Sequence, residues 1–284
     1  MTNDNSYSLT SPIAAEIGIV EYRSVIRAIS ETYGYDFSEF ALTSMKRRIE
    51  NFISAFNLRS VEALIDRLKN DKQYFQTFLK SISVESTEMF RDPSFWRTLR
   101  DQLLPLILSK VARPRVWFPT CVSGDELYTF CIVLSESNWL DKFEIIATYS
   151  NDLSLKQIQS GQFDGHKYDV SSDNYERYQG NGKIRDHFIS AEIKFQRNTS
   201  LIKNVHFIKQ NVNFDNSPTD VKLIIFRNQM LYFTQPLQDK VLTKLYNSLG
   251  QGGFIAIGVK EQMGMISSKY FRAINESENI FKKI

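Results

Sequence analysis

Five short runs of β-branched and aromatic residues follow Pro114, and stretches of other character lie between them. Each run is long enough for a strand, and each intervening stretch is long enough to cross from one parallel strand to the next. This alternation predicts an α/β fold, a largely parallel sheet with helices on both faces. The expected strands are residues 115–118, 144–148, 205–208, 223–226 and 254–257.

The part of the chain before this alternation has only helical periodicity. Apolar residues from Tyr22 to Ile82 recur at spacings of three and four, and no strand-like run interrupts them. Gly34 is placed to end the first helix, and Ser60 lies in the turn before the third. These residues predict a small all-α domain.

We therefore expect two unequal domains. A polar stretch that contains Asn and Gly breaks the alternation late in the chain, and it predicts a small β hairpin or other excursion. The expected parts are a flexible N-terminus at 1–17, a helical domain at 18–85, and an α/β domain at 86–284 with its excursion at about 165–204.

Composition narrows the function classes. The net charge of +3 comes from 35 basic and 32 acidic residues, which is too balanced to indicate a nucleic-acid-binding protein. The longest apolar runs, such as residues 103–108, fall far short of the roughly 18 residues that span a bilayer, and the N-terminus lacks a signal-peptide pattern. We expect a cytoplasmic monomer that does not insert into membranes.

Cys121 and Cys131 are the two cysteines of the chain, and neither has another Cys or His at the spacing of a metal site. Cys131 shares a helical face with Leu127, Phe130 and Leu134, so it is expected to be a buried core residue. Cys121 lies in a turn and stays open to a functional interpretation. We expect no bound metal.

The strand expected at 223–226 runs directly into Arg227 and Asn228, and Tyr232 follows closely. In an open α/β sheet, ligands bind at the carboxyl ends of the strands. Asn228 and Tyr232 are therefore candidates for contact with a ligand. The alternative is a core strand that ends in a solvated Arg–Asn pair.

A second stretch, residues 117–128, has the order strand, turn and helix. Small residues and Gly124 in the turn would let backbone amides approach a nucleotide-like ligand at the start of the helix. Asp125 and Glu126 also have a structural interpretation, because acidic residues in a first turn complement the helix dipole. Both interpretations stay open for this stretch.

A third stretch, residues 86–92, connects the two expected domains. Asp92 and Pro93 are typical of a helix start, with Asp92 as the cap and Pro93 at the first helical position. This interpretation leaves Thr87 and Arg91, in the preceding Thr-x-x-Phe-Arg, without a structural role.

In their order along the chain, these stretches resemble the chemotaxis-receptor glutamate O-methyltransferases of the CheR type, which use S-adenosylmethionine to esterify receptor glutamates. The resemblance covers nearly the whole chain. Its motifs are S-T-x-x-F-R at 86–91, G-[ED]-E-x-Y-[ST] at 124–129, S-G-x-[YF] at 160–163 and R-N-x-x-x-Y-F at 227–233. It implies a Rossmann-like, doubly wound methyltransferase sheet and a role in chemotactic signal transduction through protein methylation.

The resemblance also implies where S-adenosylmethionine, and its product S-adenosylhomocysteine, would lie. The implied cofactor-binding residues are Glu126 and the turn at Cys121 and Gly124 for the methionine part, Asn211 near the adenine, and Asn228 and Gln229 beside the sulfonium.

Thr87, Arg91 and Tyr232 would face the methyl group and the incoming glutamate. A carboxylate is already nucleophilic at neutral pH, so methyl transfer from a sulfonium needs alignment of oxygen, carbon and sulfur rather than a general base. Arg91 offers a planar pair of donors that can orient a carboxylate. Tyr232 would either donate a hydrogen bond or shape the methyl slot.

The expected partner is a helical methyl-accepting chemoreceptor or a similar signalling protein. Lys46, Arg47 and Arg48 lie together in the helical domain. A solvated helix face explains such a run equally well, but the resemblance implies that these residues dock an acidic receptor helix.

The chain departs from the family pattern in two places, the end of the second expected strand and the first turn. Tyr149 stands where the family usually has an acid for the ribose hydroxyls, and Asn151 or Asp152 would replace it only with a shifted turn. In the first turn, Pro119 has no N–H to donate and Val122 is bulky for a close approach to the cofactor. The alternative function is therefore a weakened methyltransferase-like scaffold or regulatory binding module. A methyltransferase that acts on a small molecule or a nucleic acid is a less favoured alternative, because the helical domain is no obvious nucleic-acid reader and the chain lacks an extended basic stripe.

Overall fold

The computed structural model describes residues 16–83, 87–190, 195–210, 217–264 and 267–284. The chain forms two compact units, Met1–Ile82 and Ser83–Ile284. Across the described segments, no helix is both long enough and apolar enough to cross a membrane.

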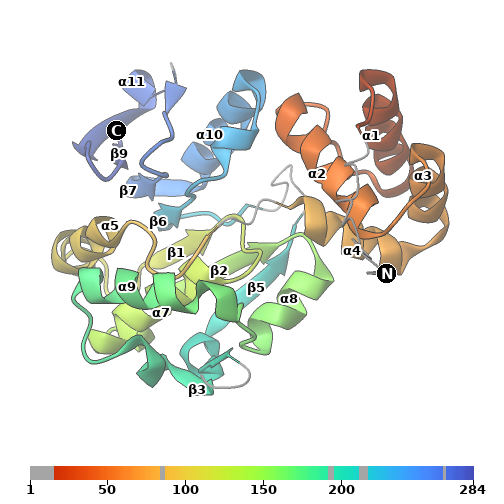
Figure 1. Ribbon diagram of the computed structural model, residues 1–284. Helices are drawn as coiled ribbons and strands as arrows, with labels where there is room; N and C mark the ends of the chain where they lie inside the picture. The colour runs from red at the N-terminus through yellow and green to blue at the C-terminus, as the bar shows by residue number, and fades with distance from the viewer. Residues whose placement is uncertain (1–15, 84–86, 191–194, 211–216, 265–266) are drawn as a thin grey trace, which may run out of the picture. The chain divides into compact units, whose positions relative to one another are not determined.

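The described part of the first unit contains α1 (Ile19–Tyr33), α2 (Leu42–Ala55), α3 (Val61–Asn70) and α4 (Lys72–Ile82), drawn in red to orange in Figure 1. Gly34 ends α1 with a φ of 72°, a left-handed conformation that favours a residue without Cβ. Ser60 caps α3, because its side chain accepts a hydrogen bond from the Ala63 N–H. The helical character predicted for this part of the chain is confirmed.

The second unit contains a seven-stranded sheet with the order β5-β2-β1-β6-β7-β9-β8. Its strands are β1 (Arg115–Phe118), β2 (Glu144–Tyr149), β5 (Val205–Lys209), β6 (Val221–Ile225), β7 (Leu249–Ala256), β8 (Phe271–Asn275) and β9 (Ile280–Lys283). The pairs β1–β2, β1–β6, β2–β5 and β6–β7 are parallel, whereas β9 is antiparallel to both of its neighbours. The predicted doubly wound sheet is confirmed, and an antiparallel pair that the sequence pattern did not reveal completes it.

The order of the strands creates a crevice at one edge of the sheet. The chain leaves β1 for β2 and β5 on one side, and it returns to β6 on the other side of β1. At such a reversal the connections diverge, so that a ligand can bind at the carboxyl ends of the two strands. In this protein those ends are Phe118 and Ile225.

Helices cover the sheet, and Figure 1 shows α7 and α10 on opposite sides of it. On the α7 side, Phe130 and Leu134 belong to one buried core with Val116 and Phe118 of β1. Cys131 is fully buried in the same core, as its helical spacing predicts. The helices of this unit are α5 (Pro93–Thr98), a π-helical turn (Leu99–Leu103), α6 (Leu104–Leu108), α7 (Asp125–Glu136), α8 (Asp152–Gln159), α9 (Tyr168–Tyr178), α10 (Gln235–Ser248) and α11 (Ser267–Tyr270).

The excursion late in the chain forms a separate two-stranded sheet. β3 (Phe188–Ser190) pairs antiparallel with β4 (Gln196–Arg197), and a single bridge joins Gln162 to Gln196. Helix α9 lies in the same stretch of sequence. The predicted β excursion is confirmed, and it also carries a helix.

One local expectation is wrong. In the sequence, Gly250 follows a helical repeat and so predicts a helix cap, and Gly252 with Gly253 predicts the turn into the next strand. Instead α10 ends at Ser248, and β7 begins at Leu249 and includes all three glycines. A Cβ at Gly253 would lie 2.9 Å from the Val221 carbonyl oxygen, where the register between β6 and β7 shifts, so close strand approach rather than a turn requires the glycine.

Candidate active site

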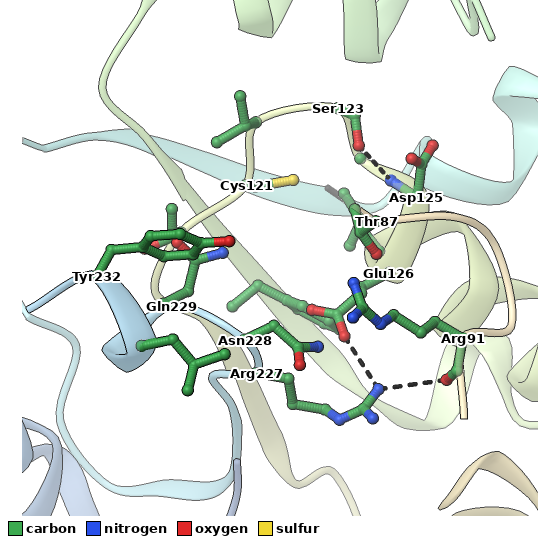
Figure 2. Close-up of a pocket in the computed structure, with 16 residues that line it drawn as sticks. Thr87, Arg91, Cys121, Ser123, Asp125, Glu126, Arg227, Asn228, Gln229 and Tyr232 are labelled. Atoms are coloured by element: carbon green, nitrogen blue, oxygen red, sulfur yellow. Dashed lines mark hydrogen bonds and ion pairs between the residues drawn. The ribbon is translucent and has the colours of Figure 1, made fainter. Parts of the chain in front are cut away.

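A pocket with a volume of about 80 Å³ lies at the carboxyl ends of β1 and β6. Three stretches singled out in the sequence meet there, although they lie far apart along the chain: residues 87–91, 118–127 and 227–232 supply its lining. The structure thus brings together Thr87, Arg91, Cys121, Gly124, Glu126, Asn228, Gln229 and Tyr232. Figure 2 labels all of these residues except Gly124 and shows their side chains around the pocket. The volume is smaller than that of pockets enclosing a whole drug-sized ligand, about 300–1,000 Å³, so this pocket suits one end of such a molecule.

The turn after β1 is held against the end of β2. The Cys121 N–H donates to the Thr148 carbonyl oxygen at 2.8 Å, and the Thr148 hydroxyl donates to the carbonyl oxygens of Phe118 and Pro119. Gly124 has a φ of 81°, and a Cβ there would lie 3.1 Å from Ile158. The positive φ therefore favours glycine at the start of α7, and the Ile158 side chain leaves little room for a Cβ. Pro119, despite its missing N–H, takes part in this arrangement through its carbonyl group.

Glu126 lies in the first turn of α7 and has a side chain that is 17% exposed. Its Oε1 accepts a hydrogen bond from Arg227 Nη1 at 3.1 Å. Burial raises the pKa of Glu126 to about 7, with the Glu261 carboxylate acting in the same direction, whereas the charges of Arg227 and Arg91 lower it. The pocket therefore holds a carboxylate that a cationic ligand group would stabilise in its ionised form.

Arg227 is buried, with 2% of its surface exposed, and it joins two carboxylates. Its Nη1 donates to Glu126, and its Nη2 donates to Asp92 Oδ2. The guanidinium also lies 4.1 Å from the centre of the Phe95 ring, a cation–π arrangement. The alternative of a solvated Arg–Asn pair after the strand is wrong for Arg227, because this side chain is an internal ion-pair partner.

The cap expected at Asp92 is also wrong in its mechanism. Asp92 precedes α5 with a φ of 55° and makes no side-chain capping bond; its carboxylate binds Arg227 instead. Pro93 does occupy the first turn of α5, as predicted. The pairing of Asp92 with a residue 135 positions away explains why local sequence could not reveal it.

The backbone before Asp92 is fixed from several sides, which places Arg91 at the pocket. The Phe90 N–H donates to the Thr129 hydroxyl at 3.0 Å, and Trp96 Nε1 donates to the Arg91 carbonyl oxygen at 2.9 Å. In Figure 2 the Arg91 guanidinium points toward Glu126 and Thr87, and the Tyr232 hydroxyl points toward the same space from the opposite side. Two side chains that can contact an incoming group therefore face each other across the pocket.

Glu261 holds the loop after β6 through hydrogen bonds. No sequence pattern had indicated a role for this residue. Its carboxylate accepts hydrogen bonds from the N–H groups of Asn228, Met230 and Gly258 at 2.6–2.8 Å. Asn228 has a φ of 60°, a conformation that Asn tolerates better than most residues. Burial raises the pKa of Glu261, while these backbone hydrogen bonds lower it. Glu261 thus links the loops that follow β6 and β7.

The side-chain amide nitrogen of Asn228, Nδ2, is buried and has no hydrogen-bond partner within the described part of the chain. A buried donor without a partner is costly, and a ligand acceptor in the pocket would satisfy it. Together with the Glu126 carboxylate, it gives the pocket one acceptor for a cation and one donor for an oxygen. This set fits the zwitterionic amino-acid end of a ligand.

The end of β2 lies outside the lining of this pocket. Tyr149 ends the strand, and it is not among the residues that line the pocket. Asn151 caps α8, with its Oδ1 accepting from the N–H groups of Leu153 and Ser154, and Asp152 forms an ion pair with Lys209 at 2.6 Å. Both substitutes considered for a ribose-binding acid are therefore engaged in other interactions. Asn211 lies outside the described residues.

The basic run of the first unit has mixed roles. Arg48 Nη1 donates to the Ile82 carbonyl oxygen at 2.9 Å, and Lys46 forms an ion pair with Glu50 at 3.5 Å. Arg47 is exposed. Docking through these three residues stays a prediction, and Arg47 is the one whose side chain is most open to solvent.

Comparison with known proteins gives consistent results over both units. Residues 85–280 match the family model of the CheR methyltransferase SAM-binding domain, and residues 20–83 match that of the CheR methyltransferase all-alpha domain. The chain is 30% identical over 265 residues to Cher3 of Pseudomonas putida, provisionally named a methyltransferase, covering 93% of this chain and 97% of that protein. It is 26% identical to a chemotaxis protein methyltransferase of Listeria monocytogenes, covering 86% and 90%, and 24% identical to one of Borreliella burgdorferi, covering 92% and 93%.

Proposed function

The chain belongs to the CheR methyltransferase family, and we propose that it transfers a methyl group from S-adenosylmethionine to glutamate side chains of a helical chemoreceptor in the cytoplasm. The cofactor is that of the family, whose matched domain binds S-adenosylmethionine. The observation that carries the proposed substrate is the placement of Arg91 and Tyr232 on opposite sides of the pocket that contains Glu126 and Asn228.

Glu126 and Asn228 would hold the methionine end of the cofactor. The Glu126 carboxylate would accept from its ammonium group, and the buried Asn228 amide nitrogen would donate to its carboxylate. Gly124 lets the chain pass close to the ligand, because a left-handed residue without Cβ leaves the backbone accessible. When bound, S-adenosylmethionine supplies an activated methyl group on a positively charged sulfur.

Arg91 would position the receptor glutamate. In the proposed reaction one glutamate oxygen would attack the methyl carbon, so that an oxygen–carbon bond would form as the carbon–sulfur bond breaks and its electron pair stays on sulfur. No proton moves in this step, which explains why the pocket needs orienting groups rather than a base. Arg91 would bind the other glutamate oxygen, and Tyr232 would border the path of the methyl group.

Arg227 would support this arrangement without contacting the substrate. It donates to the Arg91 carbonyl oxygen at 3.5 Å and to Glu126 at 3.1 Å, so it connects the proposed substrate-orienting residue with the proposed cofactor-binding residue. Arg227 also neutralises part of the negative charge of Glu126 beside the Arg91 guanidinium.

The test is methyl transfer from radiolabelled S-adenosylmethionine to a receptor cytoplasmic fragment. A glutamate methyl ester releases labelled methanol in alkali, whereas methylated nitrogen does not, so the assay identifies the bond formed. We expect alkali-labile label with the wild-type protein and at least a roughly hundredfold loss with Arg91→Ala, in line with the cost of losing a well-oriented reacting pair. The matched control is Arg100→Ala. In the wild-type protein the Arg100 guanidinium pairs with Asp101 and lies over the Tyr178 ring. Label that resists alkali would contradict the proposal.

A second candidate function, a methyltransferase-like binding module with weak cofactor affinity, is favoured by the end of β2. Tyr149 supplies no carboxylate there, and Asp152 is paired with Lys209. In this case Tyr149→Asp would strengthen S-adenosylhomocysteine binding on the order of tenfold, the value of one charged hydrogen bond. Calorimetry that finds tight wild-type binding, and no gain with Tyr149→Asp, would exclude this second function.

A further inference from the structure

Arg197 of the small sheet reaches into the turn that the proposed cofactor would contact. This residue lies on β4, is 1% exposed, and donates from Nη1 to Asp125 Oδ1 at 2.8 Å. Its Nη2 donates to the Ser123 carbonyl oxygen at 2.9 Å. These two contacts fix both sides of Gly124, across 72 and 74 positions of sequence.

The other donors of Arg197 bind the segment that follows α8. Nη2 also donates to the Gln162 carbonyl oxygen at 2.8 Å, and Nε donates to the Gly161 carbonyl oxygen at 3.4 Å. The guanidinium lies 4.2 Å from the centre of the Tyr128 ring and 5.5 Å from that of Phe163. A planar fork of donors is required for so many acceptors at once, and a lysine ammonium could not reproduce it.

Asp125 is the ion-pair partner of Arg197 in this turn. It is 3% exposed, and its other oxygen, Oδ2, lies 3.5 Å from Lys167 Nζ. Its backbone N–H donates to the Ser123 hydroxyl at 3.3 Å, so the same residue closes the turn from within. An acid at a helix start can complement the helix dipole at the surface, but a buried acid needs a charged partner, and Arg197 is the buried one of its two partners.

We propose that Arg197 is a positioning residue that holds the turn at Ser123 to Glu126 in its cofactor-binding shape and thereby couples the small β3–β4 sheet to cofactor affinity. This inference rests on the proposed function, because it assumes that this turn holds the methionine end of the cofactor. The coupling is direct: Glu126 follows Asp125 in the first turn of α7, so a shift of Asp125 moves the proposed ammonium-binding carboxylate. Arg197 itself is absent from the lining of the pocket.

The experiment is calorimetric binding of S-adenosylhomocysteine to the full-length protein at a temperature well below the melting temperature of every variant. Arg197→Lys retains the positive charge but loses the fork, and Arg197→Gln retains two donors without the charge. We expect each to raise the Kd on the order of tenfold or more, the effect of losing one charged hydrogen bond to the turn. Arg100→Lys is the control, because Arg100 pairs with Asp101 and donates to Gln179 without contacting the turn, and its Kd should stay within about twofold of the wild type.

Steady-state kinetics separates positioning from a purely structural role. A positioning role predicts that Arg197→Lys raises the KM for S-adenosylmethionine and leaves the KM for the receptor fragment unchanged. Asp125→Asn should raise the same KM, and the double variant should be no worse than the poorer single variant, because both changes break one interaction. Folded Arg197→Lys protein with wild-type Kd would overturn this inference while leaving the proposed function intact. A wild-type protein that binds no S-adenosylhomocysteine would overturn the proposed function itself.

Discussion

Arg227 Nη1 donates to Glu126 Oε1 at 3.1 Å. This bond joins the loop that follows β6 to the first turn of α7. Through its other nitrogen, Arg227 also holds Asp92, which follows the proposed substrate-orienting residue Arg91. The cofactor side and the substrate side of the pocket thus share one buried guanidinium. We therefore expect the geometry of the proposed methyl transfer to depend on this shared residue, without contact between Arg227 and either reactant.

Replacing Arg227 should cost both stability and activity. Arg227→Met would leave the carboxylates of Glu126 and Asp92 without their buried partner, and we expect a loss of about 3–5 kcal/mol in the free energy of unfolding. The pKa of Glu126 should rise further, because Arg227 now lowers it. Urea denaturation measures the first effect. Asp92→Asn is the milder comparison, since Asp92 is 26% exposed, and equal losses from both variants would contradict the dominant role of Arg227.

Cofactor affinity should fall as the pH decreases below about 7. In the folded protein without ligand, burial raises the pKa of Glu126 to about 7, so the carboxyl is increasingly protonated below that pH. A protonated Glu126 does not attract the cofactor ammonium, and binding must then release a proton. Calorimetry of S-adenosylhomocysteine binding at pH 6, 7 and 8, in buffers of different ionisation enthalpy, measures this release. Glu126→Gln should weaken binding and remove the slope; an unchanged slope in that variant would assign the proton to another group.

The same raised pKa has a consequence for stability. Because the pKa of Glu126 is higher in the folded protein than the ordinary value near 4.5, its stabilising contribution is full below that value and is lost as the pH rises through about 7. Saturation with S-adenosylhomocysteine should therefore raise the melting temperature more at pH 8 than at pH 6.

Glu261 should be needed to hold the Asn228 loop. Glu261→Gln replaces one carboxylate oxygen by an NH₂ group, which then faces backbone N–H donors of Asn228 and Gly258 or of Met230. We expect a loss of about 1–3 kcal/mol in unfolding free energy and a reduced kcat for methyl transfer. Glu276→Gln, at a turn between β8 and β9, provides the control for removing a charge from this unit. A Glu261→Gln protein of wild-type stability would show that the loop is held by other contacts.

Charge reversal at Arg47 tests the proposed receptor-docking surface. Arg47→Glu should raise the KM for the receptor fragment several-fold at low salt, and the effect should shrink as salt screens the interaction. The Kd for S-adenosylhomocysteine should not change. Lys72→Glu reverses an exposed charge on α4 of the same unit and is the matched control. Equal effects of the two charge reversals would indicate general electrostatic attraction between the helical unit and the receptor, rather than docking at Lys46, Arg47 and Arg48.

Much of the fold follows from patterns that act locally. The parallel strands are apolar runs of strand length, and Gly34 and Ser60 end or begin helices through their own conformational preferences. β8 and β9 escaped prediction because charged residues, such as the exposed Arg272 and the half-buried Lys282, interrupt their apolar residues. β9 pairs with β7 and β8 pairs with β9, so pairing at the sheet edge, rather than local propensity, makes them strands.

The residues of the candidate site likewise fall into those that the sequence could predict and those that it could not. Thr87, Arg91, Asn228 and Tyr232 could be singled out because strand ends and motif order mark them in the sequence. The supporting residues could not, because their roles come from pairings across the chain: Arg197 with Asp125, and Glu261 with Asn228. A buried arginine or glutamate has no local signature that separates it from a solvated one, so only the fold reveals its partner.

The most direct measurement is mass-spectrometric mapping of methyl esters on a receptor cytoplasmic fragment after incubation with S-adenosylmethionine and either the wild-type protein, Arg91→Lys or Tyr232→Phe. Our account predicts a mass increase of one methyl group, about 14 Da, on specific glutamates with the wild type. It also predicts a strong loss with Arg91→Lys, which cannot form the planar two-donor contact, at unchanged affinity for S-adenosylhomocysteine. Unmodified glutamates, despite tight cofactor binding by the wild-type protein, would contradict the central claim.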